Sequence, residues 1–163
     1  STDEYSLKNV NYRRICKFFN FLPEVDLFAS SLLHKTPFFY SEKPTLGSAG
    51  ANALNFRWDR KSFCHPPKNL VFDVFKKIEA EEHIDLLLIL LQTNHDTDLK
   101  RFMSGNNYFK SYVKTVAAFD SRVHFPGDKP SCFMMNNHSW YALRILKHDA
   151  LYKFKTSDIL HLN

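Results

Sequence analysis

Apolar side chains recur along the chain with two spacings, one typical of helices and one typical of buried strands. Between Leu70 and Ala80 they fall every three or four residues, with charged residues opposite, which predicts a helix with one buried face. Ile84 to Leu91 is apolar almost throughout, which is typical of a strand covered on both faces. A helix followed by such a strand indicates an α/β protein.

The first third of the chain predicts one helix and two short strands. Val10 to Phe21 carries aromatic and aliphatic residues at helical spacing, and Pro23 ends this predicted helix. Val25 to Ser30 and Phe38 to Tyr40 are short apolar segments, which we expect to pair as parallel strands. Ser41 to Ala51 is rich in Pro, Gly, Ser and Ala and predicts a surface loop, either a mobile substrate loop or an inert one.

The last third is predicted to be mostly strand. Tyr112 to Val116 forms one predicted strand, and a hairpin is expected around the turn at Pro126 to Pro130. The strands of that hairpin would be Arg122 to Phe125 and Cys132 to Met135. The segments after residue 139 have a mixed pattern that assigns neither helix nor strand.

The segment Ser62 to Val71 joins a predicted strand directly to the predicted helix. Pro66 and Pro67 end the strand, because proline has no N–H to donate to a sheet and is tolerated in a first helical turn. Ligands of open α/β sheets bind at the carboxyl ends of strands, which makes His65 to Lys68 a candidate site. The alternative is a simple strand-to-helix turn.

Length and charge limit the possibilities further. At 163 residues the chain is long enough for one domain with a substantial core, so we expect residues 1–163 to form a single domain with extensions at 1–20 and 136–163. The net charge of +5 and the isoelectric point near 9.1 favour polyanionic or acidic partners. Neighbouring domains and a protein partner stay open, since the chain begins at Ser1 rather than at a methionine.

Cysteine usage predicts a reducing compartment. Cys16, Cys64 and Cys132 are odd in number and far apart, so neither a disulfide framework nor a metal site can be assembled from them. We therefore expect an intracellular protein, cytoplasmic or nuclear, without a bound metal. No apolar run approaches the ~20 residues that span a bilayer, and no membrane partner is expected.

Several segments follow one another in an order that is similar to a known family. They are Val25-Asp26-Leu27-Phe28-Ala29, His34-Lys35, Tyr40, Asn52-Ala53-Leu54, Trp58, His65-Pro66-Pro67, Leu87 to Leu91, Arg122 to Gly127 and the segment around Phe133. In this order they resemble the phage-type Dam family of DNA adenine methyltransferases, and more closely the methyltransferase-like domain of DIRS-like retroelements. That resemblance implies a Rossmann-like methyltransferase sheet with flanking helices and a C-terminal β-hairpin.

The resemblance also implies a site for S-adenosylmethionine. Asp26, Phe28 and Ala29 match the cofactor-side strand and turn, and Asn52 stands where the family often has an acid. His65, Pro66, Pro67 and Lys68 match the catalytic turn, which holds the amino group of adenine against the cofactor and stacks the flipped base.

This chain departs from the family at both ends of that turn. The usual pattern is Asn or Asp, two prolines and an aromatic residue, whereas the chain has His65 and Lys68 at the outer positions. Neutral histidine accepts through one ring nitrogen and its protonated form through none, and lysine offers no stacking face. Weak or absent methylation is therefore expected.

Two other functions stay open. A catalytically silent relative would bind nucleic acid, most simply DNA, or a protein partner, through the basic residues Arg57, Arg60, Lys61, Lys68, Lys76 and Lys77. A hydrolase or nuclease would gather Asp26, Asp59, Asp96 and Asp98 around a divalent cation. Ordinary solvated charges are the alternative interpretation for both sets of residues.

Overall fold

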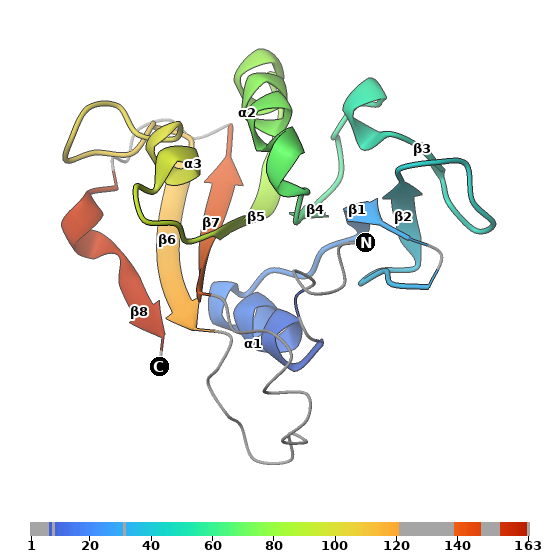
Figure 1. The fold of residues 1–163 in the computed structure, drawn as a ribbon, viewed down its shortest axis with the longest axis horizontal. Coiled ribbons are helices and arrows are strands. Elements are labelled where there is room, and N and C mark those ends of the chain that lie inside the picture. The colour runs from blue at the N-terminus through green and yellow to red at the C-terminus, as the bar shows by residue number, and fades with distance from the viewer. Residues whose placement is uncertain (1–6, 8, 31, 121–138, 148–153, 163) are drawn as a thin grey trace.

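The described part of the chain forms an α/β structure around one mixed sheet of eight strands (Figure 1). The computed structural model describes residues 7, 9–30, 32–120, 139–147 and 154–162. The strands are β1 (Val25–Ala29), β2 (Phe38–Ser41), β3 (Gly50–Ala51), β4 (Ser62–Cys64), β5 (Asp85–Leu91), β6 (Val113–Asp120), β7 (Ser139–Leu146) and β8 (Leu160–Leu162).

The helices confirm the two strongest helical patterns of the sequence. The α-helices are α1 (Asn9–Phe19), α2 (Val71–Ala80) and the single turn α3 (Thr97–Lys100), and the 3₁₀ turns are η2 (Ala53–Asn55), η3 (Lys68–Leu70) and η4 (Thr156–Asp158). α1 and α2 each begin and end within two residues of the predicted limits. Their apolar stripes therefore outweigh the aromatic and β-branched residues that lower helix propensity.

The strand order is β3-β2-β1-β4-β5-β7-β6-β8. β3, β2, β1, β4 and β5 run parallel, and Asp26 of β1 lies in register with Phe63 of β4. β7 lies antiparallel between β5 and β6, and Leu88 of β5 faces Leu143 of β7. The predicted parallel pairing of the first two strands is confirmed.

β5 separates two hydrophobic cores. Leu86, Leu88 and Leu90 point to the face covered by α2, and Leu87 and Ile89 point to the face covered by α1. All five side chains are at most 1% exposed, which confirms the prediction of a strand buried on both faces. Because successive strand residues alternate between faces, each core takes every second residue.

β7 is a strand that the sequence pattern did not assign. It pairs with β5 and β6 along its whole length, so it occupies the interior of the sheet. The pattern is obscured by Arg144, whose charged group is accommodated by an ion pair with Asp85 and by the ring of Phe21. The strands of the predicted hairpin, at residues 122–125 and 132–135, lie outside the described residues.

The connection between β1 and β2 is unusually short. Parallel neighbours normally need a crossover of a dozen or more residues that contains a helix. Here residues 30–37 make the connection, and the described part of that segment consists of bends without helix or glycine. The end of β1 therefore leads into a tight loop rather than into a helix N-terminus.

The burial of β5 makes a direct prediction about stability. Replacing Leu88 with Ala should lower the free energy of unfolding by about 2–5 kcal/mol, because it leaves a cavity in the core between the sheet and α2. Chemical denaturation monitored by circular dichroism measures the change. The control is Leu46→Ala, at a side chain that is 94% exposed, which should change stability by no more than about 0.5 kcal/mol. Equal effects of the two substitutions would contradict the two-sided core.

Candidate functional site

The HPPK turn, residues His65 to Lys68, lies at the carboxyl end of β4. The parallel neighbours of β4 are β1 and β5, so their carboxyl ends meet at the same edge of the sheet. Pro66 is buried, and the carbonyl oxygen of Pro67 accepts from the N–H of Leu70 at 2.9 Å, which closes the 3₁₀ turn that leads into α2. The prolines thus hold the turn rigidly between a strand and a helix.

His65 is uncharged at neutral pH. Its ring packs edge to face on Trp140 of β7, with centroids 4.9 Å apart. Burial lowers the pKa of His65 to about 4, and the positive charge of Lys35 acts in the same direction. One ring nitrogen is therefore free of a proton and can accept a hydrogen bond.

Asp26 is a buried carboxylate on the neighbouring strand. Its Oδ2 accepts from the backbone N–H of Lys35 at 2.8 Å, which ties the short loop to β1. Its Oδ1 is buried and has no hydrogen-bond partner among the described residues. Burial raises the pKa of Asp26 to about 6, although the hydrogen bond from Lys35 opposes this shift.

Lys35 connects this edge to the N-terminal segment. Its Nζ donates to the carbonyl oxygen of Leu7 at 2.6 Å and to Oδ1 of Asn9 at 2.8 Å. Burial lowers the pKa of Lys35, and the charge of Asp26 opposes that shift. Lys35 was not among the predicted site residues, because no spacing in the sequence indicates that a loop lysine reaches the start of α1.

Lys68, the last residue of the turn, faces solvent. Its side chain is 65% exposed, and its Nζ lies 3.6 Å from Oδ2 of Asp98. The other oxygen of Asp98 lies 3.8 Å from Nε of Arg101. The fourth position of the turn therefore belongs to a charged surface, and it offers no ring on which a base could stack.

The remaining predicted cofactor residues do not gather around Asp26. Phe28 packs on the α2 side, edge to face with Trp58 at 6.4 Å, beyond an irregularity in the β1–β2 pairing. Asn52 is exposed and follows β3, two strands away from β1, where its Oδ1 accepts from the N–H of Leu54 at 3.2 Å. Ala29 ends β1 and is half-buried. Of the predicted site residues, Asp26 and His65 thus lie on or at the end of neighbouring strands.

The predicted nucleic-acid-binding residues form no single surface. Lys76 and Lys77 lie on α2 and pair with acids one helical turn away, at 3.3 and 2.9 Å. Arg60 covers the ring of Phe38 near the opposite end of β4. Lys61 is exposed at that same end, and its carbonyl oxygen accepts from the N–H groups of residues 24 and 25.

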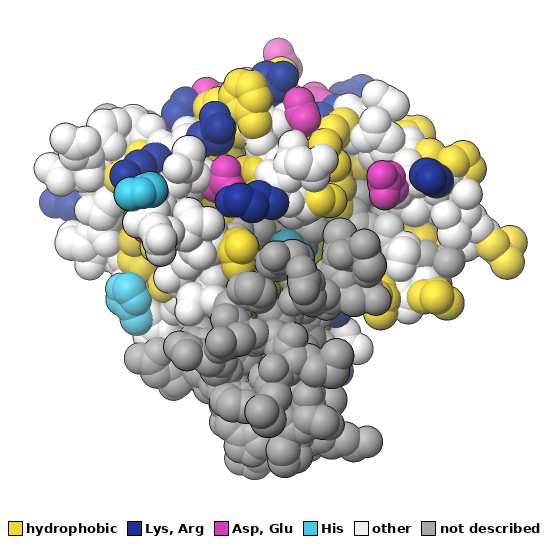
Figure 2. Space-filling model, in the orientation of Figure 1, with side chains coloured by type: hydrophobic (Ala, Val, Ile, Leu, Met, Phe, Trp, Pro, Cys, Tyr) yellow, Lys and Arg dark blue, Asp and Glu magenta, His cyan; other side chains and the backbone are white. Residues whose placement is uncertain are grey.

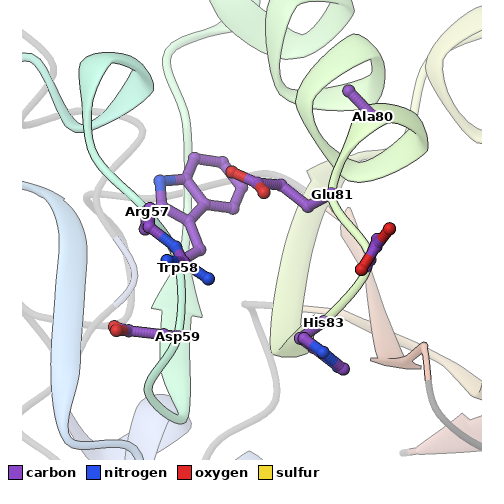
Figure 3. Close-up of a pocket in the computed structure, with 7 residues that line it drawn as sticks. Arg57, Trp58, Asp59, Ala80, Glu81 and His83 are labelled. Carbon is purple, nitrogen blue, oxygen red and sulfur yellow. The ribbon is translucent and has the colours of Figure 1, made fainter.

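A hollow of about 330 Å³ lies at the amino ends of β4 and β5, away from the HPPK turn (Figure 3). Arg57 and Asp59 reach it from the segment before β4, and Glu81 and His83 reach it from the segment after α2. The hollow is therefore separated from the candidate site by the length of β4. Its other lining residues are Trp58, Ala80 and Glu82.

The aspartates of the nuclease interpretation do not converge. Asp59 precedes β4, whereas Asp96 and Asp98 follow the opposite end of β5. Asp96 accepts from the hydroxyl group of Tyr141 at 2.9 Å, and Asp98 lies beside two cations. Within the described ranges, no group of three His, Cys, Asp or Glu side chains could hold a metal ion.

Comparison with known proteins adds no family assignment. The sequence matches no protein-family model and no curated protein. Among the described helices, none is long and apolar enough to cross a membrane.

The buried carboxylate of Asp26 makes stability depend on pH. Its pKa is about 6 in the folded chain against an ordinary value of 3.8, so the folded state binds more protons between these limits. The contribution of Asp26 to the free energy of unfolding therefore rises as the pH falls from 6 to 4. Above pH 6 the buried, charged carboxylate lowers the free energy of unfolding by up to about 3 kcal/mol. Asp26→Asn, which keeps the acceptor for Lys35, should be more stable than the wild type at pH 7.

Denaturation of both proteins between pH 4 and pH 8 measures this difference. The advantage of Asp26→Asn should shrink on acidification and disappear near pH 4. His65, with a folded pKa below its ordinary value, destabilises both proteins equally as the pH falls from 6.5 to 4, so it cancels in the comparison. A difference that stays constant with pH would show that the pKa of Asp26 is the same in the folded and the unfolded chain, which would contradict the shift caused by burial.

Proposed function

We propose that the chain is a methyltransferase-type domain that acts on adenine amino groups in nucleic acid, with S-adenosylmethionine as the methyl donor. The observation that carries this proposal is the uncharged His65 ring, held by two prolines at the carboxyl end of β4 and next to the buried Asp26 strand. A neutral acceptor at a rigid strand end is what an exocyclic amino group requires.

The strand order supports the same class. β3-β2-β1-β4-β5 is the order of a doubly wound nucleotide-binding sheet. An antiparallel β7 inserted between β5 and β6 is the arrangement expected for the Rossmann-like methyltransferase sheet that the sequence resembles. Fold alone does not define an activity, so the proposal depends on the turn.

The residues of the turn can act on the amino group without becoming charged. His65 accepts one N–H through its unprotonated nitrogen, and a backbone carbonyl of the turn accepts the other. Both bonds orient the lone pair of the amino nitrogen toward a methyl group. With both N–H groups held in this way, the amino nitrogen would be positioned to accept a methyl group and to release its proton to water.

The residues at the edge fit S-adenosylmethionine in part. Oδ1 of Asp26 is a buried acceptor without a partner among the described residues, so it can receive an N–H or O–H donor of a bound molecule. Asn52 and Phe28 do not contribute to this set, since one caps η2 and the other packs in the core. Bound S-adenosylmethionine would supply an electrophilic methyl group.

A catalytically silent module that binds nucleic acid is the second candidate. The observation that favours it is Lys68, which is exposed and lies near Asp98 where the family places a stacking ring. Such a module would keep the sheet and the turn but would transfer no methyl group.

Restoring the family residues tests the activity. Lys68→Phe should raise methyl transfer from labelled S-adenosylmethionine to an adenine-containing oligonucleotide by roughly 5-fold to 150-fold, the range that one base–aromatic stack contributes. His65→Asn in the same chain should raise it further, because an amide oxygen offers two lone pairs where the ring nitrogen offers one. Scintillation counting of the product measures both.

The control is Lys17→Phe, which places the same ring on an exposed position of α1 and should leave the rate unchanged. Titration calorimetry with S-adenosylmethionine separates the two candidates. Heat of binding that is lost in Asp26→Ala supports the methyltransferase. If no heat of binding is measured and no variant transfers a methyl group, the methyltransferase proposal is wrong and the catalytically silent module is the remaining candidate.

A further inference from the structure

Phe72 is an aromatic side chain that faces solvent on α2. Its ring is 46% exposed, while its neighbours Val71 and Val74 are buried in the core. Two cations lie over the ring: Nζ of Lys76 at 4.7 Å from the centroid and the guanidinium carbon of Arg101 at 4.5 Å. The inner side is supported by Phe75, stacked at 6.3 Å, so the exposed ring is held in place.

This ring belongs to a stripe that begins in the HPPK turn. Lys68, Phe72 and Lys76 are four residues apart, so they follow one face of the η3–α2 segment. Asp98 joins Arg101 to the stripe, since its two oxygens lie near Lys68 and Arg101. Figure 2 shows Lys and Arg side chains beside hydrophobic ones over α2 and α3 on this face, with acidic side chains among them.

The positive charge of the stripe is available to a ligand. The side chains of Lys68 and Lys76 are 65% and 57% exposed, and exposed ion pairs such as theirs are weak. Their acidic neighbours are Asp98 and Asp73. Asp98 is 15% exposed and lies near both Lys68 and Arg101, so one carboxylate faces two cations and a net positive charge remains.

We infer that the stripe of Lys68, Phe72, Lys76 and Arg101 binds single-stranded nucleic acid, with an unpaired base on Phe72 and the guanidinium of Arg101 and with phosphates on the two lysines. Aromatic faces interleaved with cations are the chemistry that recognises unpaired bases and their backbone. The bases of a duplex are stacked within the helix and cannot reach such a ring.

This inference rests on the proposed function and deepens it. A strand laid along the stripe would enter the HPPK turn at Lys68 and lead the next base to His65. Phe72 would thereby supply, for a neighbouring base, the stacking face that Lys68 does not offer to the target base.

Fluorescence anisotropy with a labelled single-stranded oligonucleotide tests the inference without cofactor. Phe72→Ala should weaken binding by roughly 5-fold to 150-fold, the range for one lost base stack. Phe72→Leu, which keeps the apolar bulk, should lose nearly as much. Lys68→Gln and Lys76→Gln should each reduce the slope of log affinity against log salt by about 0.7, because each removes one phosphate contact.

The matched control is Phe18→Ala, which removes a 41% exposed phenylalanine from α1 and should leave affinity unchanged. Thermal unfolding confirms that each variant is folded. The inference is overturned if Phe72→Ala binds as the wild type does, if duplex is bound more tightly than single strand, or if neither is bound. The proposed function fails by a different readout, the absence of heat with S-adenosylmethionine.

Discussion

Burial of β5 on both faces is the constraint on which the rest of the structure depends. A strand with closed layers above and below cannot shift in register without moving its apolar side chains into the wrong core. β5 pairs with β4 on one side and with β7 on the other, so it fixes both neighbours. The position of His65 at the end of β4, against Trp140 of β7, follows from that double pairing.

The same burial determines the electrostatics of the site. Asp26 and His65 lie on adjacent strands at one edge, and burial disfavours the charged form of each. The two pKa shifts change stability in opposite directions between pH 4 and 6. Acidification removes the buried charge of Asp26 and so stabilises the fold, whereas the shifted pKa of His65 destabilises the fold over the same range. A site of this kind keeps an uncharged acceptor across the physiological range, whereas its carboxylate is charged at a cost to stability.

Much of the fold could be predicted from the sequence, because the apolar residues of α2 and β5 follow one clear spacing each. α2 and β5 each bury a continuous stripe or run, and tertiary packing agrees with the pattern. β7 could not be assigned, because Arg144 interrupts its apolar positions and is accommodated only by groups distant in the chain. β3, with two residues, is too short to carry any period.

The sequence predicts the candidate site only where the covalent structure of a residue determines where a strand ends. Pro66 and Pro67 determine a strand end from their own covalent structure, and the HPPK turn lies there. The roles of Phe28 and Asn52 depend on which strand lies next to which. Phe28 turns toward the α2 core near an irregularity in strand pairing, and Asn52 is two strands removed from β1. Lys35 was missed for the same reason, since its contacts with Leu7 and Asn9 are long-range.

Lys68 explains why the turn and the helix after it should be considered together. A lysine at this position gives the turn no ring, yet it begins a stripe whose next member, one helical turn later, is the exposed Phe72. Asp98 lies near both Lys68 and Arg101, so it links the turn to the end of α3 on that stripe. Lys76 and Arg101 lie over the ring of Phe72, so Lys68 in the turn and the exposed ring on α2 are two parts of one surface.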